Sequence, residues 1–108
     1  MALPERNSPT DAASGSALDR DAAEALARTF RAVSDPTRLQ ILSFIHESAD
    51  GEAMVTEITA FLGLRQPTVS HHLKVMAEDG LLVRRQDGRT AWFSITPERR
   101  TAIADLLS

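Results

Sequence analysis

The amino-acid sequence predicts a mainly α-helical domain with a small β-hairpin, in the order α-α-α-α-β-β-α. Apolar residues recur at helical spacing over most of the chain. A short helix and a longer one are separated by a tight turn, and an Asp-Gly pair lies between two runs of β-favouring residues. With 108 residues, of which 43% are hydrophobic, the chain has the size and composition of one small domain.

The chain is expected to divide into a disordered N-terminal arm, residues 1–17, and one folded domain, residues 18–108. The arm is rich in Pro, Ser, Ala and Asn and has little apolar surface to bury. Apolar residues then recur every three or four positions from Leu18 to Val33, which predicts the first helix.

The second helix is predicted to begin after Asp35. An aspartate is a good N-cap, and Pro36 follows it at the first helical position, where proline fits best. The turn signal Asp50-Gly51 predicts that this helix ends near residue 50.

The third and fourth helices have the spacing of a helix-turn-helix. The stretch Met54–Gly63 predicts a short helix with Gly63 at its C-terminal end. Pro67 opens the next helix, which runs to Gly80. In a helix-turn-helix the second helix is placed to enter the major groove of DNA.

The hydrophobic period changes after the fourth helix. Two β-favouring runs flank Asp87-Gly88, which is a strong signal for a hairpin. Thr96 is expected to cap a last helix that begins at Pro97. The predicted fold is therefore a winged helix-turn-helix.

Two adjacent histidines in the segment QPTVSHHLKVM raise the question of a metal or catalytic site. On a helical wheel, His71 lies opposite the apolar side, and His72 lies at the edge of that side. Side chains roughly 100° apart are poorly placed to chelate one ion. His72 is expected to hydrogen-bond toward a neighbouring backbone instead. The apolar side consists of Val69, Leu73 and Met76.

The polar side of this helix and the hairpin are predicted to contact DNA. The net charge is −3, but residues 65–100 contain seven basic and four acidic residues, a local excess of three positive charges. Hydrogen-bonding and cationic side chains suit base edges and phosphates. A solvated helix face and a solvated hairpin are the alternatives. The candidate residues are Arg65, Gln66, Thr68, Ser70, His71 and Lys74 on the helix, and Arg84, Arg85 and Arg89 on the hairpin.

Three segments in combination resemble the ArsR/SmtB family of winged-helix transcriptional regulators. They are DPTRLQIL (35–42), QPTVSHHLKVM (66–76), and GLLV (80–83) with DGR (87–89). The resemblance covers about residues 20–107. It implies a homodimer built from the first and last helices, which binds an imperfect inverted repeat near a promoter. It also implies a repressor that is released by a ligand, commonly a metal ion.

Two apolar stripes are predicted to form the subunit interface, because they are too apolar for the surface of a monomer. The stripes are Leu26, Phe30 and Val33 on the first helix, and Ile103, Leu106 and Leu107 on the last.

The metal sites that the resemblance implies are missing from this sequence. The chain has no cysteine, and its last helix has no histidine. The remaining metal hypothesis is an oxygen and nitrogen site for nickel or zinc, with His46, Glu47 and Asp50 as candidate ligands. Glu52 and the acidic residues of the first helix are possible additions across a dimer. The alternative is that these side chains are solvated. No other cofactor is predicted.

The predicted function is a sequence-specific DNA-binding repressor acting as a dimer on an operator. The alternative is a winged-helix module for protein contact, whose partner subunit does the sensing. An enzyme is not expected, because the chain has no cysteine, no tyrosine, no Gly-rich phosphate loop and no HExxH motif. No apolar run approaches the ~18 residues that span a bilayer, so a cytoplasmic protein without a membrane partner is expected.

Overall fold

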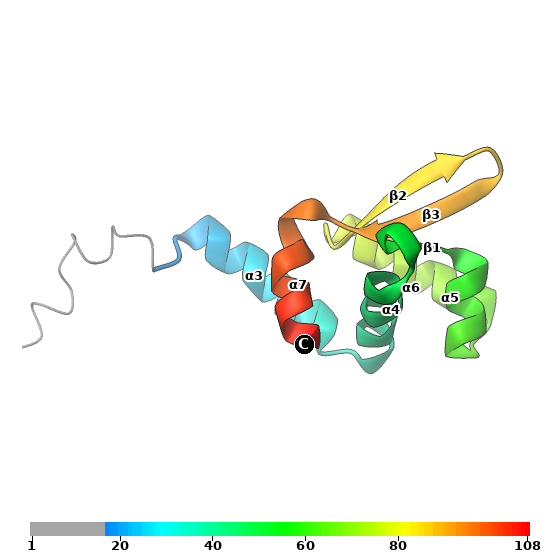
Figure 1. Ribbon diagram of the computed structural model, residues 1–108. Coiled ribbons are helices and arrows are strands. Elements are labelled where there is room, and N and C mark those ends of the chain that lie inside the picture. The colour runs from blue at the N-terminus through cyan, green and yellow to red at the C-terminus, as the bar shows by residue number, and fades with distance from the viewer. Residues whose placement is uncertain (1–16) are drawn as a thin grey trace, which may run out of the picture.

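The computed structural model describes residues 17–108, so the arm expected over residues 1–17 lies almost entirely outside the described residues. Five helices, a short 3-10 turn and three strands make up the fold (Figure 1). The helices are α3 (Arg20–Val33), α4 (Pro36–Glu47), α5 (Val55–Leu62), α6 (Gln66–Glu78) and α7 (Pro97–Leu107). The 3-10 turn is η2 (Ala49–Gly51), and the strands are β1 (Glu52–Met54), β2 (Leu82–Asp87) and β3 (Thr90–Ile95).

The predicted order of helices and hairpin is confirmed, with one strand added. The strand β1 pairs antiparallel with β3, so the sheet has the order β1-β3-β2. Only Ala53 of β1 is buried, and its two neighbours are half-buried. Three residues are too few to show a period of two in the sequence, which explains why this strand was not predicted. The third helix consequently begins at Val55 rather than at Met54.

Local hydrogen bonds explain where the helices begin and end. The side chain of Asp35 accepts a hydrogen bond of 2.9 Å from the backbone N–H of Arg38, as expected of an N-cap. Asp19 does the same at the start of α3, where it accepts from Ala22 at 2.8 Å. The helix α5 ends at Gly63, whose φ of 69° lies in the left-handed region that glycine adopts without strain.

The wing is the two-stranded hairpin β2–β3, and its loop differs from the prediction by one position. Pairing runs from Leu82 opposite Ile95 to Asp87 opposite Thr90, which leaves Gly88 and Arg89 as the two loop residues. The φ of Gly88 is 61°, as required at the first central position of a type II′ turn. The prediction had centred the turn on Asp87-Gly88.

The core forms around α4 and the inner face of α6. Ile41, Leu42 and Ile45 of α4 are fully buried. The predicted apolar side of the fourth helix is confirmed, since all of its members are buried: Val69, Leu73 and Met76. The base of the wing and α7 close the core with Leu81, Leu82, Phe93, Ile95 and Ile103.

The helix α3 lies largely outside this core, beside α7 (Figure 1). Among its residues only Thr29 and Ala32 are buried. No helix within residues 17–108 is both long and apolar enough to cross a membrane.

Candidate nucleic-acid interface

The outer face of α6 presents the side chains that the sequence analysis selected. The inner face is packed against the core, which fixes the rotation of the helix about its axis. A short turn after Gly63 connects α5 to α6, as a helix-turn-helix requires. Every helix residue predicted to contact DNA is exposed: Arg65, Gln66, Thr68, Ser70, His71 and Lys74.

The two histidines of α6 differ in environment, as the helical wheel indicated. His71 is exposed and His72 is half-buried, and their ring centroids are 6.5 Å apart. The Nδ1 atom of His72 is buried but forms no hydrogen bond with any of the described residues. The expectation that His72 bonds to a neighbouring backbone group is therefore wrong.

The arginines Arg84 and Arg85 lie on opposite faces of the wing, because successive side chains of a strand alternate. Arg84 pairs across the hairpin with the buried Phe93, so it lies on the face that is turned toward α6. Arg85 pairs with Trp92 on the opposite face. Arg89 occupies the loop at the tip of the wing and is exposed.

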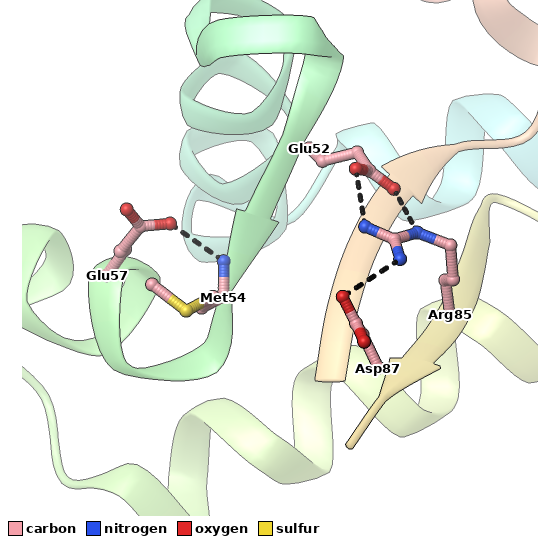
Figure 2. Close-up of polar contacts among 5 residues, drawn as sticks. All are labelled: Glu52, Met54, Glu57, Arg85 and Asp87. Atoms are coloured by element: carbon pink, nitrogen blue, oxygen red, sulfur yellow. Dashed lines mark hydrogen bonds and ion pairs between the residues drawn. The ribbon is translucent and has the colours of Figure 1, made fainter. Parts of the chain in front are cut away.

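Arg85 is engaged within the protein itself. Its Nε and Nη2 atoms donate hydrogen bonds of 2.9 Å each to the two carboxylate oxygens of Glu52 (Figure 2). Its Nη1 atom lies 3.8 Å from Asp87, and the guanidinium lies 5.8 Å from the ring centre of Trp92. Such a bidentate pair fixes the plane of the guanidinium. The donors that were expected to reach a DNA phosphate therefore point to Glu52 in this structure.

The ion pair shifts the pKa values of both partners so that each side chain stays charged over a wider pH range. The hydrogen bond from Arg85 lowers the pKa of Glu52 below its ordinary value, although burial acts in the opposite direction. The hydrogen bond to Glu52 raises the pKa of Arg85 for the same reason. Because Glu52 belongs to β1 and Arg85 to β2, the pair connects the two outer strands across β3.

From the sequence, Glu52 is predicted only as a possible metal ligand and not as a partner of the wing. Glu52, Ala53 and Met54 are one charged residue followed by two apolar ones, so the sequence shows no alternation that would indicate a strand here. On the wing, the alternation of strand side chains was the signal that separates Arg84 from Arg85.

The apolar stripes predicted for the dimer are only partly at the surface. Phe30 and Leu106 are 50% and 45% exposed. Ile103 is fully buried in the core, which corrects its assignment to the interface, because α7 turns this residue toward α4. The remaining members are half-buried: Leu26, Val33 and Leu107. Val33 and Leu107 also pack against the core.

The candidate metal ligands do not form a site within one chain. The Nε2 atom of His46 lies 4.0 Å from a carboxylate oxygen of Glu47, and Asp50 lines a shallow cavity with His46. No group of three histidine or acidic side chains in the part of the chain that the structure describes could hold a metal ion. Within one protomer, the described residues therefore do not fit a metal ion.

Comparison with known proteins identifies the relatives of this fold. Residues 35–83 match the model of the arsR family of bacterial regulatory proteins. The chain is 40% identical over 81 residues to a probable mercury resistance operon repressor of Streptomyces lividans. The aligned region covers 75% of this chain and 60% of that protein. It is 36% identical over 84 residues to a helix-turn-helix-type transcriptional regulator of Methanocaldococcus jannaschii, with coverage of 78% and 92%.

A solved structure agrees with these matches. It is the solution structure of the homodimeric winged helix-turn-helix DNA-binding domain of a possible ArsR-family regulator from Mycobacterium bovis. The identity is 27%, the TM-score is 0.67, and the match covers 86% of this chain and 85% of that one. These relatives are regulators of transcription rather than enzymes, which confirms the prediction of a regulator made from the sequence. The chain has the helix-turn-helix and the wing, and its matches extend over most of its length. It therefore belongs to the ArsR/SmtB family of winged-helix transcriptional regulators.

Proposed function

We propose that the protein is a dimeric repressor that binds an operator with α6 in the major groove and the wing against the phosphate backbone. The outer face of α6 carries this proposal together with Arg65 at its N-cap, because the six polar and cationic side chains selected there are all exposed while the inner face of the helix is fixed in the core. A rigid helix with such a face meets the requirement for reading base edges. Thr68, Ser70 and His71 are proposed to contact bases, with Gln66 at the helix entry.

Phosphate contacts are proposed for the cations that surround this helix. Lys74 and Arg84 border the same space between α6 and the wing, and Arg89 extends from the wing tip. Arg65 lies directly before the first turn of α6. None of these four forms an ion pair within residues 17–108, so their charges remain available to a polyanion.

The dimer is proposed to form through α3 and α7. Three large apolar side chains in this region are at least 45% exposed: Leu18 just before α3, Phe30 of α3 and Leu106 of α7. A mainly apolar groove of about 270 Å³ lies between the two helices. Apolar surface of this kind is typical of a subunit contact. A two-fold dimer would place two copies of α6 about one helical turn of DNA apart.

The decisive experiment is selection of DNA from the genome of the source organism by the purified protein, followed by sequencing. The recovered fragments are expected to share an inverted repeat close to a promoter. Binding to a synthetic duplex of that repeat should weaken steeply as salt concentration rises. Recovery of fragments without a common sequence would leave the protein-contact alternative as the better account.

A repressor of a promoter would act in the cytoplasm, beside the chromosome.

A metal effector would have to be an ion that oxygen and nitrogen donors bind well, such as nickel or zinc, because the chain has no cysteine. Its ligands would have to come from two protomers, since one protomer supplies no group of three among its described residues. Calorimetry with nickel and zinc on the wild type and on His46→Ala tests this. Absence of binding below about 100 μM would exclude these ions as effectors.

A further inference from the structure

A cleft lies between the recognition helix α6 and the wing. Its volume is about 370 Å³, near the lower end of the roughly 300–1,000 Å³ found for small-molecule sites. The walls come from α6 on one side and from β2 and β3 on the other, with Val55 of α5 at one end. The cleft is thus formed by four elements, all of which contribute residues to the same core.

The lining of the cleft is mainly apolar. Leu73 and Phe93 are buried core residues whose sides reach it, at 1% and 5% exposure. Ala77 of α6 and Ala91 of β3 contribute small side chains, which leave the space between the two walls open. A DNA phosphodiester is polar throughout, so it would not use this apolar lining. An occupant with an apolar body would.

Cations stand on both walls at the rim. Lys74 projects from α6 and Arg84 from β2, and neither forms an ion pair with another residue of the described chain. Glu78 is the only acidic residue of the lining, one helical turn after Lys74. Two cations against one carboxylate leave a net positive rim, which favours a negatively charged group on the occupant.

We propose that this cleft binds a small organic anion, a carboxylate carried by an aromatic or branched aliphatic body. The body lies against Leu73 and Phe93, and the carboxylate lies between Lys74 and Arg84. Ser70 and Lys74 line the cleft and also belong to the DNA-contacting face, so a bound anion excludes DNA. This last clause rests on the proposed function, whereas binding of the anion does not.

The site is tested by titrating the ¹⁵N-labelled full-length protein with 1-naphthoate in the absence of DNA and following the backbone amide signals. Saturable shifts are expected in α6 around Leu73–Glu78 and in β3 around Ala91–Phe93. The dissociation constant should be roughly 1 mM or lower, the affinity that ordinary ligand efficiency gives for a molecule of this size. The neutral analogue 1-naphthalenemethanol should bind about fivefold more weakly, because it cannot pair with the rim cations.

Three surface variants separate the rim from the rest of the wing. Lys74→Gln and Arg84→Gln should each weaken naphthoate binding about fivefold. Arg89→Gln removes the same charge from the same hairpin but does not line the cleft, and it should bind as the wild type does. Ala77→Phe fills the cleft and should abolish the shifts; Ala91→Leu repeats this test from the other wall if Ala77→Phe does not fold.

The proposal is overturned if no saturable shifts arise, if they map to the groove between α3 and α7, or if the neutral analogue and the Gln variants bind equally well. A second measurement tests exclusion, with naphthoate added to the protein bound to its selected duplex. Release of DNA at the ligand concentration that saturates the cleft supports competition, and unchanged DNA affinity overturns it. Failure of the ligand-free protein to bind any selected duplex contradicts the proposed function alone, and the naphthoate titration still decides the site.

Discussion

Replacing Arg84 or Arg85 by glutamine should have different effects on DNA binding, although the two residues are adjacent and have the same charge. Arg84 lies on the face of the wing that is turned toward α6 and has no ion pair within the described residues. Arg85 is held by two hydrogen bonds to Glu52 on the opposite face. Only Arg84→Gln should therefore remove a phosphate contact.

The expected magnitude follows from counterion release. Each phosphate contact adds about 0.9 to the slope of log affinity against log salt concentration. A dimer carries two copies of Arg84, so the slope of Arg84→Gln should be smaller by about 1.8 than that of the wild type. Between 50 and 200 mM salt, wild-type affinity should then fall about 12-fold more than the affinity of the variant.

The assay is fluorescence anisotropy of a labelled operator duplex at four or more salt concentrations, with Arg85→Gln as the matched control. The double variant Glu52→Gln/Arg85→Gln corrects for the unpaired carboxylate that Arg85→Gln leaves behind. If the two substitutions lower the salt slope equally, or if Arg85→Gln alone lowers it, the assignment of the two faces is refuted.

Four further outcomes are expected. Ser70→Ala should lose about 1–3 kcal/mol of operator affinity but keep its affinity for random DNA, as measured by competition binding; equal loss on both would contradict base contact. Leu106→Glu should sediment as a monomer at micromolar concentration, whereas a monomeric wild type would exclude the proposed interface. Leu73→Ala, at a fully packed position, should lose about 2–5 kcal/mol of unfolding free energy in urea titrations, and a loss below that range would show that the α6 contact is loose. The folded pKa of Glu52 is lowered, so its pair with Arg85 should be present above pH 4.5 and be lost as the pH falls through that lowered pKa. The fluorescence of Trp92, the single tryptophan, should report this loss in the wild type and not in Glu52→Gln, and the same acid transition in both proteins would disprove the link.

Most of the fold could be predicted from the sequence because its signals are local. Asp35 caps its helix through its own side chain, and the buried side of α6 follows from the helical period alone. The prediction failed where a residue depends on partners far along the chain. The strand β1 exists because it pairs with β3, about forty positions later, and three residues carry too little pattern to show it.

The same distinction applies to the candidate site. Exposure of the candidate DNA-contacting residues on α6 was predictable, because they lie on the side of the helix opposite a periodic apolar face. The ion pair between Arg85 and Glu52 was not predictable, since 33 positions separate the two residues and only the sheet register brings them together. The burial of Ile103 was missed for a related reason: the helical period gives the apolar face of α7, but not which part of it is covered by the core and which is left for a partner.

The short strand β1 has a consequence for how this protein can adapt to its operator. Its last residue, Met54, is followed at once by α5, and its ladder partner is β3 of the wing. The backbone N–H of Met54 also donates to Glu57 in the first turn of α5 at 2.9 Å (Figure 2). The helix-turn-helix and the wing therefore share one rigid joint. In the proposed dimer, the distance between α6 and the wing tip is set inside each protomer, and any adjustment to operators of different half-site spacing would have to come from the contact between protomers.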